Sequence, residues 1–184
     1  GNDDDYVDRF AVKISDLFFD EVAKDRNPRN GKFVPAFQSL LSNIYFGLRT
    51  SATPDGRKVG DPLADTLSPV HGQDKKGFTA VMRSVSKIDL ERAAQMILNL
   101  RFSESLTKSK ESVRKISELI KVYLIDLEGG QVQFNVISGD VLREAQKHPE
   151  KYRDLIVRVT GYSAFFVELN RETQNDILAR TEQF

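Results

Sequence analysis

A single glycine interrupts an apolar, strand-like segment near the end of the chain, RVTGYSAFF (Arg158–Phe166). Glycine weakens a strand, because it has no side chain to pack and loses more conformational freedom on folding than any other residue. One interpretation of Gly161 is a tight turn between two strands. The other is chemical: removing a hydrogen atom from a backbone Cα leaves an unpaired electron between an amide nitrogen and a carbonyl group.

Glycine suits such a carbon radical better than any other residue. The amide nitrogen donates electron density and the carbonyl withdraws it, so the unpaired electron spreads over both, whereas a side chain would crowd the planar centre. The flanking apolar side chains would keep water away, although they also suit an ordinary core. They are Val157, Val159, Phe165, Phe166 and Val167.

The composition excludes several other chemistries. The chain has 184 residues and no cysteine, which removes disulfides, zinc–thiolate sites, iron–sulfur ligation and cysteine nucleophiles. Its 27 basic residues balance its 27 acidic ones, which argues against an electrostatic role on nucleic acid or a membrane surface. No apolar run approaches the ~18 residues of a membrane span, and the acidic start, GNDDDY, predicts no signal peptide. We therefore expect a cytoplasmic protein.

Helices and strands alternate along the chain, which predicts an α/β fold. Residues 33–48 are predicted to form an extended or mixed buried segment, because Pro35 argues against a long helix. Residues 50–78 form a long polar loop of a kind that is often functional. Apolar spacing and helix-capping residues, with Asp89 and Asn170 as N-caps, predict helices over residues 6–24, 79–87, 90–100, 109–127, 139–148 and 171–181. Alternation and short apolar runs predict strands at 131–137 and 155–159.

The segment VRVTGYSAFFVEL (157–169) resembles the C-terminal signature of glycyl radical enzymes, which include pyruvate formate-lyase and the glycerol and diol dehydratases. Further segments resemble that family in the same order, namely TPDGRKVGDPLAD, SPVHGQDKKG, GGQVQFNVIS and AQKHPEKYRDLIVRVTGY. The resemblance covers nearly the whole chain, and the ordered set is more specific than the RVxGY core alone.

The resemblance implies that Gly161 is the radical site and that its neighbours form the motif of the radical loop, namely Arg158, Val159, Thr160, Tyr162 and Ser163. It also implies the C-terminal portion of a ten-stranded α/β barrel, ending in a glycine-radical loop and a terminal helix. We divide this single domain, residues 1–184, into barrel helices, strands and the long loop (1–130) and the glycyl radical segment (131–184).

The same resemblance implies the partners. An activating enzyme that uses S-adenosylmethionine and an iron–sulfur cluster would install the radical, so neither a metal nor a cofactor would bind this chain directly. The remaining partners are the N-terminal remainder of the barrel and a second copy in a homodimer. In the family, a cysteine on another loop carries the radical to the substrate. Because this chain has no cysteine, we expect it to store a radical but not to turn over substrate alone.

Three alternatives remain open at this point. The start at Gly1 fits a C-terminal piece of a longer lyase, dehydratase or formate acetyltransferase, and SPVHGQDKKGFTAV and TGYSAFFVEL favour the dehydratase-like branch. A stand-alone glycyl radical cofactor that repairs an oxygen-cleaved enzyme is the second alternative. However, the likeness begins well before the terminal segment that such proteins share. A plain binding module is the third.

Four other polar residues receive structural interpretations. His148 precedes Pro149 and ends a helix, and His71 lies in a predicted turn, although it could also line the substrate side of the long loop. Each histidine stands alone in the sequence, so neither indicates a metal site. Asp55 and Arg57 in PDGR are expected to form a local pair that fixes a turn.

Overall fold

The computed structural model describes residues 1–183, in which helices alternate with strands as the sequence predicts. The α-helices are α1 (Asp5–Lys24), α2 (Ser42–Gly47), α3 (Phe78–Val85), α4 (Lys110–Lys121), α5 (Gly139–Lys147) and α6 (Arg171–Ala179). The strands are β1 (Ala36–Phe37), β2 (Gln95–Phe102), β3 (Gln131–Val136), β4 (Ile156–Arg158), β5 (Ser163–Phe165) and β6 (Glu182–Gln183). A π-helical turn, Val122–Asp126, extends α4, and short 3-10 turns lie at Leu90–Arg92, Glu104–Thr107, Pro149–Lys151 and Phe166–Glu168.

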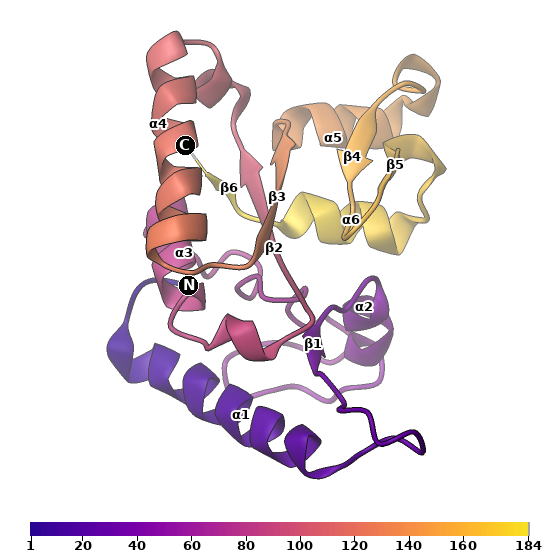
Figure 1. Cartoon of the computed structure of the whole chain (residues 1–184). Helices are drawn as coiled ribbons and strands as arrows, with labels where there is room; N and C mark the ends of the chain where they lie inside the picture. The colour runs from indigo at the N-terminus through magenta and orange to yellow at the C-terminus, as the bar shows by residue number, and fades with distance from the viewer. Residues whose placement is uncertain (184) are drawn as a thin grey trace.

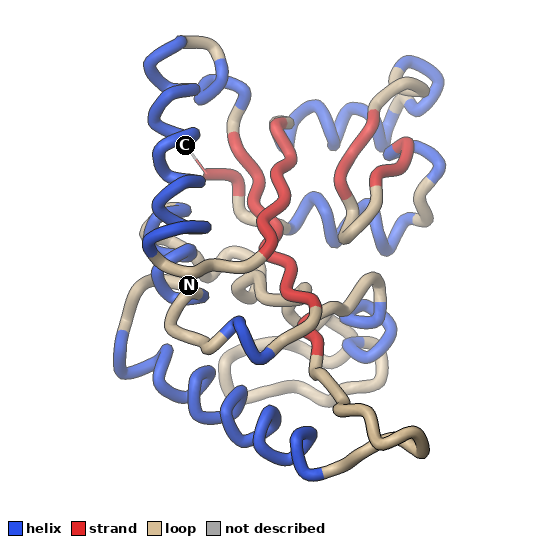
Figure 2. The backbone as a smooth tube through the Cα atoms, in the orientation of Figure 1, coloured by secondary structure: helices blue, strands red, loops and turns tan. Residues whose placement is uncertain are grey.

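Strand β2 is the centre of an open parallel sheet (Figures 1 and 2). It pairs with β3 along most of its length, from Ile97 opposite Gln131 to Phe102 opposite Val136. Its first residues pair with β1 and its last residues pair with β6, again in parallel. Strands β4 and β5 form a separate antiparallel hairpin. The strands of residues 1–183 therefore make no closed barrel.

The central strands present chemically different residues to their two faces, because successive side chains alternate in direction. On one face of β2, the side chains of Leu98, Leu100 and Phe102 join a buried cluster with residues of α3 and with Tyr123. The other face carries Asn99 and Arg101 of β2 and Gln133 and Asn135 of β3. Figure 1 shows α3 and α4 on one side of these strands and β4, β5, α5 and α6 on the other.

A second buried cluster supports the hairpin of β4 and β5. It joins α5, α6 and the hairpin through Ile137, Leu142, Ala145, Val157, Val159, Phe166 and Ile177. Asn170 caps α6 as predicted, because its side chain accepts a hydrogen bond from the Thr173 amide. The hairpin therefore rests on helices that precede and follow it in the chain.

The prediction of a helix over residues 90–100 is wrong. Residues Leu90–Arg92 form only a 3-10 turn, Asp89 makes no capping hydrogen bond with its side chain, and Gln95–Phe102 is strand β2. Residues 97–102 are all buried because both faces of β2 are covered. A strand buried on both faces lacks the alternating pattern, so the sequence alone does not separate it from a buried helix.

The other predicted elements are confirmed, but the apolar side of α1 is exposed and not buried. Residues 50–77 contain no helix or strand, and the remaining predicted helices and strands form, although the last helix ends at Ala179. The buried residues of α1 are Asp8, Ser15 and Phe19, and its apolar stripe is exposed to solvent at Val7, Phe10, Ile14, Leu17 and Phe18. Helix α1 thus faces the rest of this chain with its more polar side.

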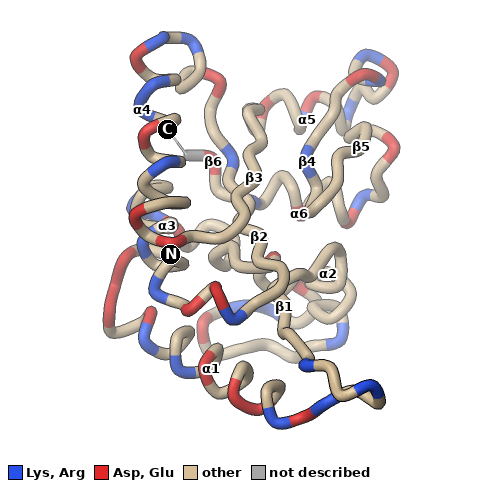
Figure 3. Tube along the Cα trace, in the orientation of Figure 1, with Lys and Arg blue, Asp and Glu red and all other residues tan. Residues whose placement is uncertain are grey.

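Ion pairs attach the start of α1 to the end of α3. The Lys87 ammonium lies 2.8 Å from Asp3, 2.7 Å from Asp5 and 2.8 Å from Asp8. Desolvation favours the neutral amine, but the hydrogen bonds to these carboxylates outweigh it and raise the pKa of Lys87 above its usual value. Elsewhere, basic and acidic residues are interspersed along the chain (Figure 3).

Among residues 1–183, every helix is too short or too polar to cross a membrane. The division of the domain at residue 130 stays a prediction. Strands β2 and β3 pair across that position, so the two parts share one sheet.

We expect Leu98→Ala to lower the free energy of unfolding by about 3 kcal/mol, because Leu98 is fully buried in the centre of β2 and truncation leaves a cavity. Urea denaturation of this chain measures the change. Leu17→Ala is the matched control, since Leu17 is 61% exposed on α1 and its loss should change stability by less than about 0.5 kcal/mol. Equal effects of the two substitutions would contradict this description of the core.

Candidate functional site: the glycine hairpin

Gly161 lies at the tip of the β4–β5 hairpin, residues 156–165, which we call the glycine hairpin. Arg158 pairs with Ser163, and the Val159 amide donates to the Tyr162 carbonyl at 2.9 Å, which closes a four-residue turn. Gly161 is the third residue of that turn and has φ +77°. Residues with side chains rarely adopt this left-handed conformation, which glycine accepts without strain. The predicted tight turn is confirmed, and the positive φ of its third residue favours glycine.

Thr160, the other residue at the tip, points into the protein and is fully buried. Its hydroxyl lies 2.7 Å from the Val159 carbonyl and 3.2 Å from Asp65 Oδ1, and it accepts a hydrogen bond from Asn99 Nδ2 at 3.2 Å. Asp65 belongs to the long loop and is 1% exposed. The hairpin therefore meets the long loop and β2 at one buried carboxylate.

Asp65 is surrounded by donors from separate parts of the chain, and we call this set the Asp65 cluster: Ser39, Asp65, Asn99, Thr160 and Arg180. Ser39 Oγ donates to the carboxylate at 2.8 Å and Asn99 Nδ2 donates at 2.6 Å. Arg180 Nη2 lies 3.3 Å away. A buried carboxylate is tolerated only when its oxygens are paired in this way.

Arg180, which directly follows α6, connects this cluster to the backbone of the turn. Its Nη1 donates to the Val159 carbonyl at 2.8 Å, and its Nη2 also pairs with Asp176 at 3.2 Å. Asp176 accepts from Asn43 Nδ2 at 3.0 Å, and His71 Nε2 lies 3.6 Å from it. One guanidinium thus lies between two buried carboxylates and holds a carbonyl of the turn.

The opposite side of the turn contacts the polar face of β3. The Gly161 amide donates to Gln133 Oε1 at 3.2 Å, and Arg158 Nε donates to the same oxygen at 2.7 Å. Two residues further along β3, the Asn135 side chain bonds both the amide and the carbonyl of Arg158, each at 2.7 Å. Strand β3 therefore holds the hairpin through side-chain amides rather than through a sheet ladder.

The predicted motif residues all lie in the hairpin, where they have different surroundings. Val159 and Thr160 are buried, whereas Gly161, Tyr162 and Ser163 are exposed. Of the residues expected to shield the glycine, Val157, Val159 and Phe166 are buried, Val167 is partly buried and Phe165 is 38% exposed. The hairpin is therefore buried on the side of Val157, Val159 and Phe166, whereas Gly161 at its tip is exposed to solvent.

Sequence reasoning missed the residues that hold the turn, namely Asp65, Asn99, Gln133, Asn135, Asp176 and Arg180. The polar alternation of Gln131, Gln133 and Asn135 was a usable signal, because it marks one face of a strand that packs against something polar. Nothing local distinguishes Asp65 or Arg180 from the other charged residues. The residues that Asp65 contacts are distant in sequence, namely Ser39, Thr160 and Arg180.

The four other polar residues singled out in the sequence lie outside the hairpin. Arg57 fixes its loop by donating to backbone carbonyls, including that of Asp61 at 2.7 Å, while Asp55 accepts from Thr53. Asp55 and Arg57 do interact locally, since the Asp55 carboxylate accepts a hydrogen bond from the Arg57 backbone, whereas the guanidinium points toward carbonyls and makes no salt bridge with Asp55 among the described residues. His148 follows α5 as expected.

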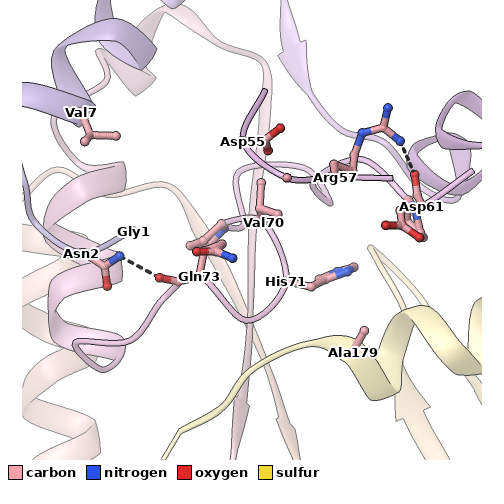
Figure 4. A pocket seen from close by; sticks show the side chains of 13 residues that line it. Gly1, Asn2, Val7, Asp55, Arg57, Asp61, Val70, His71, Gln73 and Ala179 are labelled. Carbon is pink, nitrogen blue, oxygen red and sulfur yellow. Dashed lines mark hydrogen bonds between the residues drawn. The ribbon is translucent and has the colours of Figure 1, made fainter. Parts of the chain in front are cut away.

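A cavity of about 650 Å³ lies between the start of the chain and the long loop (Figure 4). Arg57, Val70, His71 and Ala179 contribute to its wall, and the Asn2 side chain donates to the Gln73 carbonyl beside it. None of residues 156–165 lines it. Within residues 1–183, no three His, Asp or Glu side chains gather as metal ligands. The cavity therefore lies apart from the glycine hairpin.

We expect Asp65→Ala to lower the free energy of unfolding by about 3 kcal/mol, because it leaves Ser39, Asn99 and Thr160 without their acceptor. Urea denaturation of this chain measures this loss. Asp140→Ala removes a carboxylate of the surface pair with Arg143, so it should cost less than about 1 kcal/mol. A loss no larger than that of the surface control would show that the cluster does not hold the hairpin.

Two family models match this chain: the one described as Glycine radical over residues 63–167, and the one described as Pyruvate formate lyase-like over residues 1–47. The probable dehydratase YbiW of Escherichia coli is 39% identical, and the match covers 99% of this chain and 23% of that protein. An isethionate sulfite-lyase of Oleidesulfovibrio alaskensis is 41% identical over 99% of this chain and 22% of its own length. The glycerol-bound B12-independent glycerol dehydratase of Clostridium butyricum superimposes with a TM-score of 0.95 at 49% identity, and the match covers all of this chain and 23% of that one. The chain therefore belongs to the glycyl radical enzyme family and corresponds to the C-terminal glycine radical domain of its members.

Proposed function

We propose that this chain carries the backbone radical of a glycyl radical dehydratase or lyase and that Gly161 is the radical carbon. The observation that carries this proposal is the position of Gly161. It lies inside the segment that the Glycine radical family model matches, at the exposed tip of a hairpin that is held from both sides. Arg158, Val159, Thr160, Tyr162 and Ser163 would form the surrounding motif.

A glycine suits a stored radical at this position. Loss of one α-hydrogen leaves a planar carbon whose electron spreads into the amide nitrogen and the carbonyl, and no side chain opposes that planarity at glycine. The space where a Cβ would stand is bounded by Gln38 Nε2 at 3.6 Å and Ile97 Cδ1 at 3.7 Å, which is ordinary packing distance. Packing around the turn therefore does not by itself exclude a side chain at this position.

Substrate chemistry would need residues from outside this chain. The sequence contains no cysteine to form a thiyl radical, and the chain spans less than a quarter of the length of the relatives it matches. The exposed apolar stripe of α1 is a surface that another part of the enzyme would cover. We therefore expect the N-terminal remainder of the barrel to be the main partner and the isolated chain to be inactive.

The exposed glycine is also consistent with the proposed activating enzyme, which must reach the Gly161 α-carbon. An S-adenosylmethionine and iron–sulfur enzyme would supply the oxidising chemistry, and this chain would supply only the glycine. Because a glycyl radical reacts with oxygen, the proposal also implies a protein that works without oxygen, and we propose that it works in the cytoplasm.

The matched region does not select a substrate. Relatives named for dehydration and for sulfite elimination match it with similar identity, so its residues serve the chemistry that these reactions share. The 49% identity to the glycerol dehydratase favours a dehydratase over a formate acetyltransferase. A stand-alone radical cofactor that repairs a cleaved enzyme is the alternative, and the reading frame upstream of Gly1 separates the two.

We expect anaerobic activation of the protein, as its gene encodes it, to give an electron paramagnetic resonance doublet from the one remaining α-hydrogen, and Gly161→Ala to abolish it. Alanine should cost only about 1–2 kcal/mol of stability, through its positive φ. Gly72→Ala is the matched control, because Gly72 has φ +73° and nothing lies within 4 Å of its Cβ position. A doublet in the Gly161 variant, or its loss in the Gly72 variant, would reject the assignment.

Air should cut the activated protein at Gly161, because oxygen adds to the radical carbon and the peroxyl product fragments the backbone. Mass spectrometry should then find a C-terminal peptide beginning near Tyr162. The same exposure without prior activation should leave the chain whole. An intact chain after activation and air would count against a radical at this position.

A further inference from the structure

We propose that the Gln133 side chain is a positioning residue that tunes the radical through the Gly161 amide. This inference rests on the proposed function, because it concerns how an electron at Gly161 would be distributed. Its basis is one contact: the Gly161 N–H donates to Gln133 Oε1 at 3.2 Å. The amide nitrogen is bonded directly to the α-carbon that would carry the unpaired electron.

The orientation of the Gln133 side chain is determined by its surroundings. Its Oε1 accepts from both the Gly161 amide and Arg158 Nε, the latter at 2.7 Å, and a flipped side chain would place an NH₂ group against those two donors. Gln133 is 7% exposed, and its contacts with the hairpin are partly buried. Its Nε2 is buried and has no hydrogen-bond partner among the described residues.

That unpartnered Nε2 is informative because a buried polar group without a partner usually costs 1–3 kcal/mol. A residue selected only for packing would avoid that cost, whereas an amide kept for its oxygen would accept it. Only the acceptor side of Gln133 is used, and both donors that it serves belong to the glycine hairpin. The side chain is therefore placed to present an oxygen to the turn.

An acceptor at this amide would affect the radical electronically. A hydrogen bond from N–H to an oxygen makes the nitrogen richer in electrons, and a richer nitrogen donates more strongly into the half-filled orbital of the neighbouring carbon. Spin density should then move from the α-carbon to the nitrogen. The contact is partly buried, because Gln133 is buried and Gly161 is exposed, so its effect does not need a dry site.

Asn135 provides a matched control on the same face of the same strand. It also holds the hairpin through a side-chain amide, but it bonds the backbone of Arg158 and not that of Gly161. Replacing it should loosen the hairpin without removing the acceptor of the Gly161 amide. Comparing substitutions at Gln133 and Asn135 therefore separates an electronic effect on the radical from a general loss of rigidity in the hairpin.

The experiment uses the protein as its gene encodes it, with ¹⁵N-labelled glycine, activated without oxygen. The variants are Gln133→Met, which removes the acceptor at similar length, Gln133→Glu, which retains one, and Asn135→Leu. Electron-nuclear double resonance measures the ¹⁵N coupling of the radical. Hydrogen exchange of the resting protein measures protection of the peptide that contains Gly161.

We expect Gln133→Met to lower the nitrogen coupling, to raise the α-hydrogen splitting and to shorten the radical lifetime by up to about fivefold, the factor for one net hydrogen bond. Gln133→Glu should keep or increase the coupling, because a carboxylate is a stronger acceptor. Asn135→Leu should speed hydrogen exchange without changing the coupling. If Gln133→Met fails to fold, the Gln133→Glu result still decides the question, since a lower coupling there contradicts the proposal.

Unchanged coupling in Gln133→Met, or an equal change in Asn135→Leu, would overturn the proposal while leaving the radical at Gly161 intact. Absence of any doublet in the unaltered protein would instead reject the proposed function. In that case, hydrogen exchange still reports whether Gln133 protects the Gly161 amide in the resting protein.

Discussion

The four-residue turn from Val159 to Tyr162 is the constraint on which the arrangement of this domain depends. Its third residue is left-handed, which favours glycine at position 161, and its second residue turns a hydroxyl into the protein toward the buried carboxylate of Asp65. Burying that carboxylate is favourable only because several donors surround it, Arg180 among them. The turn thus sets where the long loop, β2 and the end of α6 must meet.

The central sheet makes this meeting possible by dividing its residues between two faces. Leucines and phenylalanines on one face of β2 and β3 pack with α3 and the end of α4. Burial of these side chains stabilises this side of the sheet through the hydrophobic effect. The opposite face is polar and would be costly to bury without partners. The glycine hairpin supplies the partners of Gln133 and Asn135, through its backbone and the Arg158 guanidinium, which explains why amide side chains rather than aliphatic ones occupy β3 at these positions.

The hairpin therefore combines firm attachment with an exposed tip. Its rear is fastened by a buried apolar cluster and by Arg180, while Gly161 remains open in this chain. The apolar stripe of α1 is open as well, on a different part of the molecule. Both features fit a domain that packs against another part of a larger protein. The match covers only 23% of the length of its relatives, which agrees with that view. A stored radical would need such a cover to exclude water and oxygen.

Local sequence signals determined much of this protein. Helical spacing, N-caps such as Asn170 and the alternation in β3 were sufficient for most elements, and the ordered motifs identified the family and directed attention to Gly161. Only the tertiary structure decided that Gln95–Phe102 is a strand, because pairing with β3 and burial on both faces erase the local pattern. It alone brought Asp65, Gln133 and Arg180 to the turn, since charged and polar residues look alike in sequence until distant segments meet. Periodicity and capping are properties of neighbouring residues, whereas the burial and pairing of a charge are properties of the folded chain.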